Sequence, residues 1–151
     1  MATRTRKPVR AALPEAATYL ELLVTQDQLA GEAASLLGTH DLTPQQYNVL
    51  RILRGGDAGG LPCQVIGERM IQRVPDVTRL VDRLEAAKLV ERARIAEDRR
   101  VVLVRITNAG RDVLAKLDAP VDALHKQQFA ALAPAELAEL QRLLQKARER
   151  R

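Results

Sequence analysis

The sequence has few aromatic residues, a single cysteine and no long apolar segment, and each absence excludes a class of protein. Tyr19, Tyr47 and Phe129 are the three aromatic residues among 151, so a core must be built from aliphatic side chains. Cys63 alone cannot form an internal disulfide, which is compatible with a reducing compartment. No apolar run approaches the roughly 20 residues that cross a bilayer, and no apolar segment follows the basic N-terminus as in a secretory signal. We expect a cytoplasmic protein.

The motifs of catalysis and of cofactor binding are also missing. We find no G-x-S-x-G, Walker loop, H-E-x-x-H or paired cysteines or histidines. The glycine cluster GGDAGG (55–60) lacks the Lys-Ser/Thr that phosphate binding requires. His40 and His125 lie far apart in the sequence, without the paired spacing of zinc ligands. We therefore expect neither an enzyme nor a metal or cofactor site.

Positive charge is distributed unevenly along the chain. Residues 1–10 and 142–151 each carry a net charge of +4, residues 61–106 carry +3, and the rest carries −6. This asymmetry indicates a surface that meets nucleic acid in one place. Basic tails are common in other proteins, so charge alone leaves a role outside nucleic-acid binding open.

Hydrophobic periodicity and capping residues predict six helices and one hairpin. Residues 1–13 form a flexible basic arm, and a helix over 14–38 follows. Thr43 caps the next helix, with Pro44 in its first turn, and a short helix follows the 55–60 loop. Further helices begin after Thr107, with a kink expected at Pro120, and at Pro134.

The segment between the short helix and Thr107 has the clearest pattern. Val77, Leu80, Val81 and Leu84 form an apolar stripe at helical spacing, and Arg79 points away from it. Two runs rich in β-branched residues then flank a polar loop at 96–100, which predicts a β-hairpin.

The order of these elements predicts a mainly α protein with a small two-stranded β-wing. Residues 39–106 form a winged helix-turn-helix, flanked by helices at 14–38 and 107–151. The flanking helices have apolar stripes, and the rest of the same chain offers too little surface to bury them. Burial against a second copy predicts a twofold homodimer.

Four segments resemble the MarR family of bacterial transcriptional regulators: LTPQQYNVLRIL, VTRLVDRLEAAKLVER, DRRVVLVRITNAG and LAPAELAELQRLL. The similarity runs from about Pro14 to the C-terminus. It implies a homodimer that binds a pseudo-palindromic operator in double-stranded DNA. Such a protein is usually a repressor, relieved by a small molecule or an oxidant.

The resemblance assigns residues 77–84 to the recognition helix in the major groove. Thr78, Arg79 and Arg83 are then candidates for base or phosphate contacts. Arg73 and Asp76, just before this helix, are further candidates. The Asp76 carboxylate suits the helix dipole but repels phosphate, or it accepts a hydrogen bond from a cytosine amino group.

The family's wing motif Asp-x-Arg matches Asp98 and Arg100. The arginine would enter the minor groove, whose negative potential favours a guanidinium, and Asp98 would hold that guanidinium bidentately. Arg99 would contact phosphate. The alternative is a solvated turn with an incidental ion pair.

The sequence departs from the family in three places. The turn at 70–75 lacks the usual glycine and serine cap, although Pro75 fits the first helical turn. The first helix has no cysteine where peroxide sensors keep one, and Pro120 interrupts a helix expected to support the dimer.

Weaker signals concern regulation. Tyr19, His40 and Tyr47 border the helices that line an effector pocket in the family, although both tyrosines also fit a core. Cys63 is either a buried inert thiol or a redox sensor at a helix N-terminus. Two alternative functions remain: a winged-helix module for protein–protein assembly, and a DNA-coating protein without sequence preference.

Overall fold

The computed structural model of the chain describes residues 13–149, so the basic arm expected at 1–13 lies, apart from Leu13, outside the described residues. These residues divide between Glu32 and Ala33 into two compact units, at a boundary inside the first helix, α1 (Pro14–Gly38). No helix among residues 13–149 is both long and apolar enough to cross a membrane.

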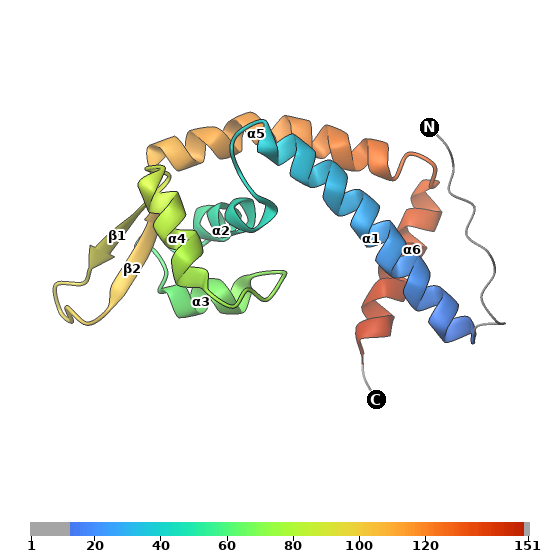
Figure 1. Cartoon of the computed structure of the whole chain (residues 1–151), viewed down its shortest axis with the longest axis horizontal. Helices are drawn as coiled ribbons and strands as arrows, with labels where there is room; N and C mark the ends of the chain where they lie inside the picture. The colour runs from blue at the N-terminus through green and yellow to red at the C-terminus, as the bar shows by residue number, and fades with distance from the viewer. Residues whose placement is uncertain (1–12, 150–151) are drawn as a thin grey trace. The chain divides into compact units, whose positions relative to one another are not determined.

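The second unit contains the end of α1, five further helices and a hairpin (Figure 1). The hairpin projects from the cluster formed by the second, third and fourth helices. The predicted mainly α fold with a two-stranded wing is confirmed. The elements are α2 (Pro44–Gly55), α3 (Cys63–Arg69), α4 (Val77–Ala86), β1 (Val90–Arg94), β2 (Val102–Ile106), α5 (Asn108–Gln128) and α6 (Pro134–Arg148).

The predicted N-caps are confirmed and explain where two helices begin. Thr43 Oγ1 accepts from the Gln46 amide at 3.2 Å, and the Gln46 side chain accepts from the Thr43 amide at 2.9 Å. This reciprocal capping box satisfies two amides that the first turn of α2 would leave unpaired. Thr107 Oγ1 accepts from the Gly110 amide at 3.1 Å and starts α5.

The core is aliphatic, as the composition predicts, and α2 packs against α3, α4, β2 and α5. On α4, Val81 and Leu84 are buried while Val77 and Leu80 pack at the edge of the core, which confirms the apolar stripe. The side chains with under 2% exposure are Val49, Leu50, Ile66, Val81, Leu84, Val90, Val104, Leu114 and Leu117.

The hairpin differs from the prediction in two respects. The loop between its strands is longer, and a third segment of the chain pairs with β2. Residues 95–101 join the strands, rather than 96–100, since β1 ends at Arg94 and β2 begins at Val102. Leu61 pairs with Val104 through two backbone hydrogen bonds of 2.9 and 2.8 Å, which sequence analysis missed. This bridge joins the residue that follows the 55–60 loop to the middle of β2.

Helix α5 continues through Pro120, so the expected interruption is not observed. Proline lacks one backbone donor, which removes a single hydrogen bond of the helix. Buried Leu117 and Val121 on either side of Pro120 hold both halves of α5 on the same core.

Lys88, two residues beyond the end of α4, adopts a conformation that favours glycine. Its φ is +61°, and its amide donates to the Glu85 carbonyl at 2.8 Å while the Leu89 amide donates to the Leu84 carbonyl at 2.9 Å. This is the Schellman arrangement, whose left-handed position normally holds glycine. Lys88→Gly should therefore raise the free energy of unfolding by about 1 kcal/mol, measured by urea denaturation.

Ala86→Gly is the matched control for this prediction. Ala86 is the last residue of α4 and is exposed, so glycine there should lower the free energy of unfolding by about 0.5–1 kcal/mol. If both substitutions destabilised the protein equally, the left-handed turn at Lys88 would not be strained.

Candidate nucleic-acid interface

The outward face of α4 presents the residues expected to meet DNA. Thr78, Arg79 and Arg83 are all exposed. The helix begins at Val77, and Asp76 is its N-cap, with a carboxylate oxygen that accepts from the Arg79 amide at 3.0 Å. From the sequence, Pro75 was expected in the first turn of this helix. It precedes the N-cap and therefore lies outside the helix. One oxygen of Asp76 is occupied by capping.

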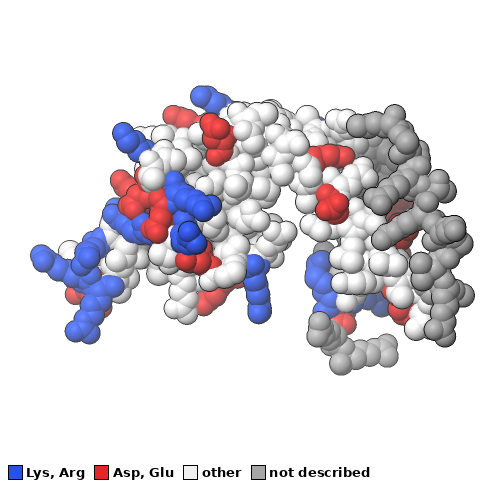
Figure 2. Space-filling view, in the orientation of Figure 1, with Lys and Arg blue, Asp and Glu red and all other residues white. Residues whose placement is uncertain are grey.

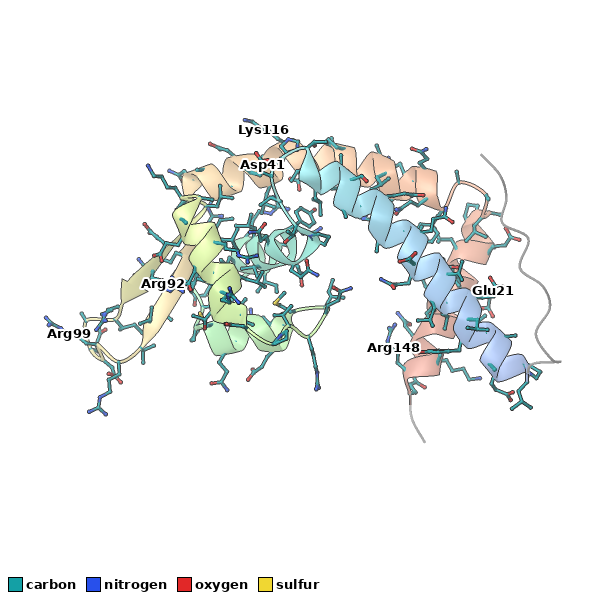
Figure 3. All side chains as sticks on the ribbon, viewed as in Figure 1. Glu21, Asp41, Arg92, Arg99, Lys116 and Arg148 are labelled. Carbon is teal, nitrogen blue, oxygen red and sulfur yellow. The ribbon has the colours of Figure 1, made fainter. Side chains whose placement is uncertain are left out.

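Arg92 of β1 joins α4 to the wing. Its Nη2 donates to Asp82 Oδ1 at 2.6 Å, its Nη1 donates to Glu85, and its amide donates to Glu85 Oε1 at 3.2 Å. Figure 3 shows Arg92 between α4 and the hairpin. This contact was not predicted from the sequence, although carboxylates three residues apart on α4 are a usable signal for a shared cationic partner.

Asp98 has a different role in the wing loop from the one expected. Its carboxylate accepts from the backbone amide of Arg100 at 2.9 Å, and among residues 13–149 Asp98 and Arg100 form no ion pair. The carboxylate therefore shapes the turn, and the Arg100 guanidinium is left exposed. Figure 2 shows positive side chains gathered at this end of the hairpin, and Figure 3 labels Arg99 there.

A further ion pair joins α2 to α5. Arg54 donates from both terminal nitrogens to the two oxygens of Asp118, each at 2.9 Å. The hydrogen bonds from Arg54 hold the pKa of the Asp118 carboxyl below its ordinary value. Nearby, the Arg51 guanidinium lies 5.8 Å from the centre of the Tyr47 ring. The Arg54–Asp118 pair was not predicted, because it depends on how α2 and α5 meet in the folded chain. The Arg51–Tyr47 contact lies within α2 at a spacing of four residues, which is a usable sequence signal.

A small apolar cavity lies beside Tyr47, between the end of α1, α2 and α5. Its volume is about 130 Å³. Of the three residues expected at an effector pocket, Tyr47 lines this cavity. His40, whose ring nitrogen lies 2.9 Å from Thr39 Oγ1, is not among the described lining residues, and Tyr19 lies in the first unit. The lining residues are Ala33, Leu36, Leu37, Pro44, Tyr47, Val121, Leu124 and His125.

Cys63 has the environment of an unreactive thiol. Burial raises the pKa of this thiol, and the positive charge of Arg92 only partly offsets that effect. The side chain is half-buried at the start of α3. Within the described part of the chain, no three His, Cys, Asp or Glu side chains gather as a metal site would require.

Two apolar surfaces remain uncovered, one in each unit. On the first part of α1, several large side chains are exposed, among them Tyr19 (61%) and Val24 (55%). In the second unit, the angle between α5 and α6 forms an open groove of about 570 Å³. Leu137, Leu140 and Leu144 of α6 line one side of it.

Comparisons with known proteins agree with this architecture. A sequence profile described as "MarR family" matches residues 40–101. The HTH-type transcriptional regulator TtmR of Methylorubrum extorquens is 40% identical over 84 residues, which cover 56% of this chain and 42% of TtmR. This chain thus spans less than half of that relative.

Two solved structures are similar over almost the whole chain. A MarR transcription factor from Planctomyces limnophilus is 39% identical with a TM-score of 0.69, and the match covers 91% of this chain and 98% of that one. A mutant MarR from E. coli complexed with operator DNA is 25% identical with a TM-score of 0.78, and the match covers 92% and 100% of the two chains.

Proposed function

This chain belongs to the MarR family of transcriptional regulators, and from that membership we propose a homodimeric, cytoplasmic repressor that binds a pseudo-palindromic operator and is released by a small molecule. The main support for this proposal is the combination of an exposed recognition helix and a wing with arginines at its tip. The Arg92 contacts with α4 hold the two in a fixed relation. The similar E. coli protein was crystallised with operator DNA.

In this proposal α4 lies in the major groove. Thr78, Arg79 and Arg83 contact base edges or phosphates, since all three are exposed on the outward face. Arginine there can bind guanine bidentately, which contributes about 1–3 kcal/mol of discrimination. Arg73, exposed in the turn before α4, contacts phosphate, and the oxygen of Asp76 not used in capping is available to a cytosine amino group.

The wing tip lies in the adjacent minor groove. Arg100 inserts its guanidinium, which the Asp98 turn leaves exposed, and Arg99 contacts phosphate. A narrow minor groove concentrates negative potential and so favours an inserted arginine. Asp98 thus positions Arg100 through its backbone amide.

The uncovered apolar surfaces support a dimer. Exposed Tyr19, Leu22, Leu23 and Val24 on α1 would cost solvation energy in a monomer, and so would the groove between α5 and α6. A twofold axis would bury these surfaces against their copies. Sedimentation equilibrium should therefore give twice the chain mass of 16.7 kDa.

The cavity beside Tyr47 is the site we propose for the effector. Its volume of about 130 Å³ is close to the ~150 Å³ of an apolar cavity that holds benzene. It lies where α2 meets α5, so a ligand there would act on the junction between the winged part and α5. An effector releases DNA only if it binds the two states of this junction with different affinity.

The experiment that tests this function is a spacing series on a selected operator. Duplexes enriched from a random pool should contain two half-sites about 10 base pairs apart. Inserting about five base pairs, half a helical turn, should reduce the affinity to that of a scrambled duplex. Undiminished binding after insertion would favour a DNA-coating protein, and no binding to any duplex would favour an assembly module.

A further inference from the structure

The face of the hairpin that meets α4 carries a second arginine closer to the tip. Arg92 contacts Asp82 and Glu85, so its side chain defines the face turned toward α4. Side chains alternate along a strand, so Arg94 projects from the same face, about 7 Å nearer the tip. Its cross-strand neighbour there is Val102.

The charge of Arg94 is not neutralised. Arg92 is paired with two carboxylates, whereas Arg94 forms no ion pair within the described part of the chain. Its Nη1 donates to the carbonyl oxygen of Arg99 at 3.5 Å, a long hydrogen bond that is easily exchanged for a stronger acceptor. The side chain is exposed.

The position of Arg94 matters because α4 and the wing tip occupy neighbouring grooves of the DNA in the proposed complex. The inference rests on the proposed function, in which α4 enters the major groove and the wing tip enters the next minor groove. One sugar–phosphate strand separates these two grooves. That strand must cross the hairpin face between the Arg92 contacts and the tip, and Arg94 occupies this stretch.

We propose that Arg94 is a phosphate-binding residue of the wing. Its side chain contacts the sugar–phosphate strand between the two grooves and makes no contact with the bases. An acceptor with full negative charge replaces the weak contact with the Arg99 carbonyl. Because phosphate contacts carry no sequence information, Arg94 contributes affinity to every duplex.

Arg94→Gln tests this proposal by the salt dependence of binding. Each dimer would lose two phosphate contacts, so the slope of log K against log salt should become less steep by about 2. At 0.15 M salt, this corresponds to about a thirtyfold loss of affinity. Operator and scrambled duplexes should lose similar factors, so their ratio should change little.

Two further variants separate charge from structure. Arg94→Lys keeps the charge and should keep the parental salt slope. Lys116→Gln removes an exposed cation on α5, distant from the wing in Figure 3, and should bind like the parent.

Two results would overturn the assignment of Arg94 alone, namely an unchanged affinity in Arg94→Gln, or a weaker affinity with the parental salt slope. The second result would assign Arg94 to holding the wing loop. If the unsubstituted protein binds DNA without sequence preference, the proposed operator function is wrong. Arg94→Gln should still make the salt dependence of binding less steep in that case. A parent that binds no DNA at all would overturn both.

Discussion

Replacing Arg100 with alanine should weaken operator binding by at least about thirtyfold without changing the dimer. Each dimer would lose two minor-groove contacts, and at about 1 kcal/mol or more each this corresponds to that factor. The Asp98 contact is made with the backbone amide of residue 100, which alanine retains, so the loop should keep its shape. Fluorescence anisotropy with an operator duplex measures the change, and sedimentation confirms the dimer.

Arg111→Ala is the control, because it removes an exposed arginine in the first turn of α5 rather than in the wing. Its operator affinity should stay within a few-fold of the parent. Parental affinity in Arg100→Ala would show that the wing assignment is wrong.

Replacing Gly110 with alanine should lower the free energy of unfolding by about 3 kcal/mol, the upper end of the usual cost of overpacking. A Cβ at this position would lie 2.3 Å from the Leu89 carbonyl oxygen and 2.8 Å from Ile106 Cγ1. The same carbonyl accepts from the Thr107 amide at 3.1 Å, and Thr107 Oγ1 donates to the Lys88 carbonyl at 2.8 Å. Relief of the overlap would break these contacts between the start of α5 and the base of the wing.

Gly31→Ala is the matched control, since Gly31 also lies in a helix but a Cβ added there would meet no atom within 4 Å. Alanine there should be neutral or stabilising by up to about 1 kcal/mol. Both variants should be compared by urea denaturation at one protein concentration, because the stability of a dimer depends on concentration. Equal stability of the two variants would show that the close approach at Gly110 is not maintained in solution.

Much of the fold could be predicted because its signals are local. The stripe of Val77, Val81 and Leu84 determines the buried face of α4 through helical periodicity alone. Thr43 and Thr107 identify helix starts because a cap acts on amides only three residues away. These features depend on spacing within one element, which a single sequence contains.

The remaining features depend on contacts between distant elements. The Arg92 contacts with Asp82 and Glu85 require the register of the hairpin against α4, which periodicity does not determine. The role of Asp98 in the structure differs from the expected one for a related reason. A carboxylate two residues before an arginine can accept from its guanidinium or its amide, and the tight loop favours the nearer amide. The DNA-contacting roles of all these residues stay predictions.

Fluorescence anisotropy with two duplexes tests whether the protein binds DNA with sequence specificity. One carries the region upstream of the protein's own gene, the other carries the same bases scrambled, and both are titrated at two salt concentrations near physiological. The proposed function predicts a preference of roughly 10³-fold or more for the native duplex. Equal affinity for both duplexes, falling steeply with salt, would contradict it and indicate binding through charge alone.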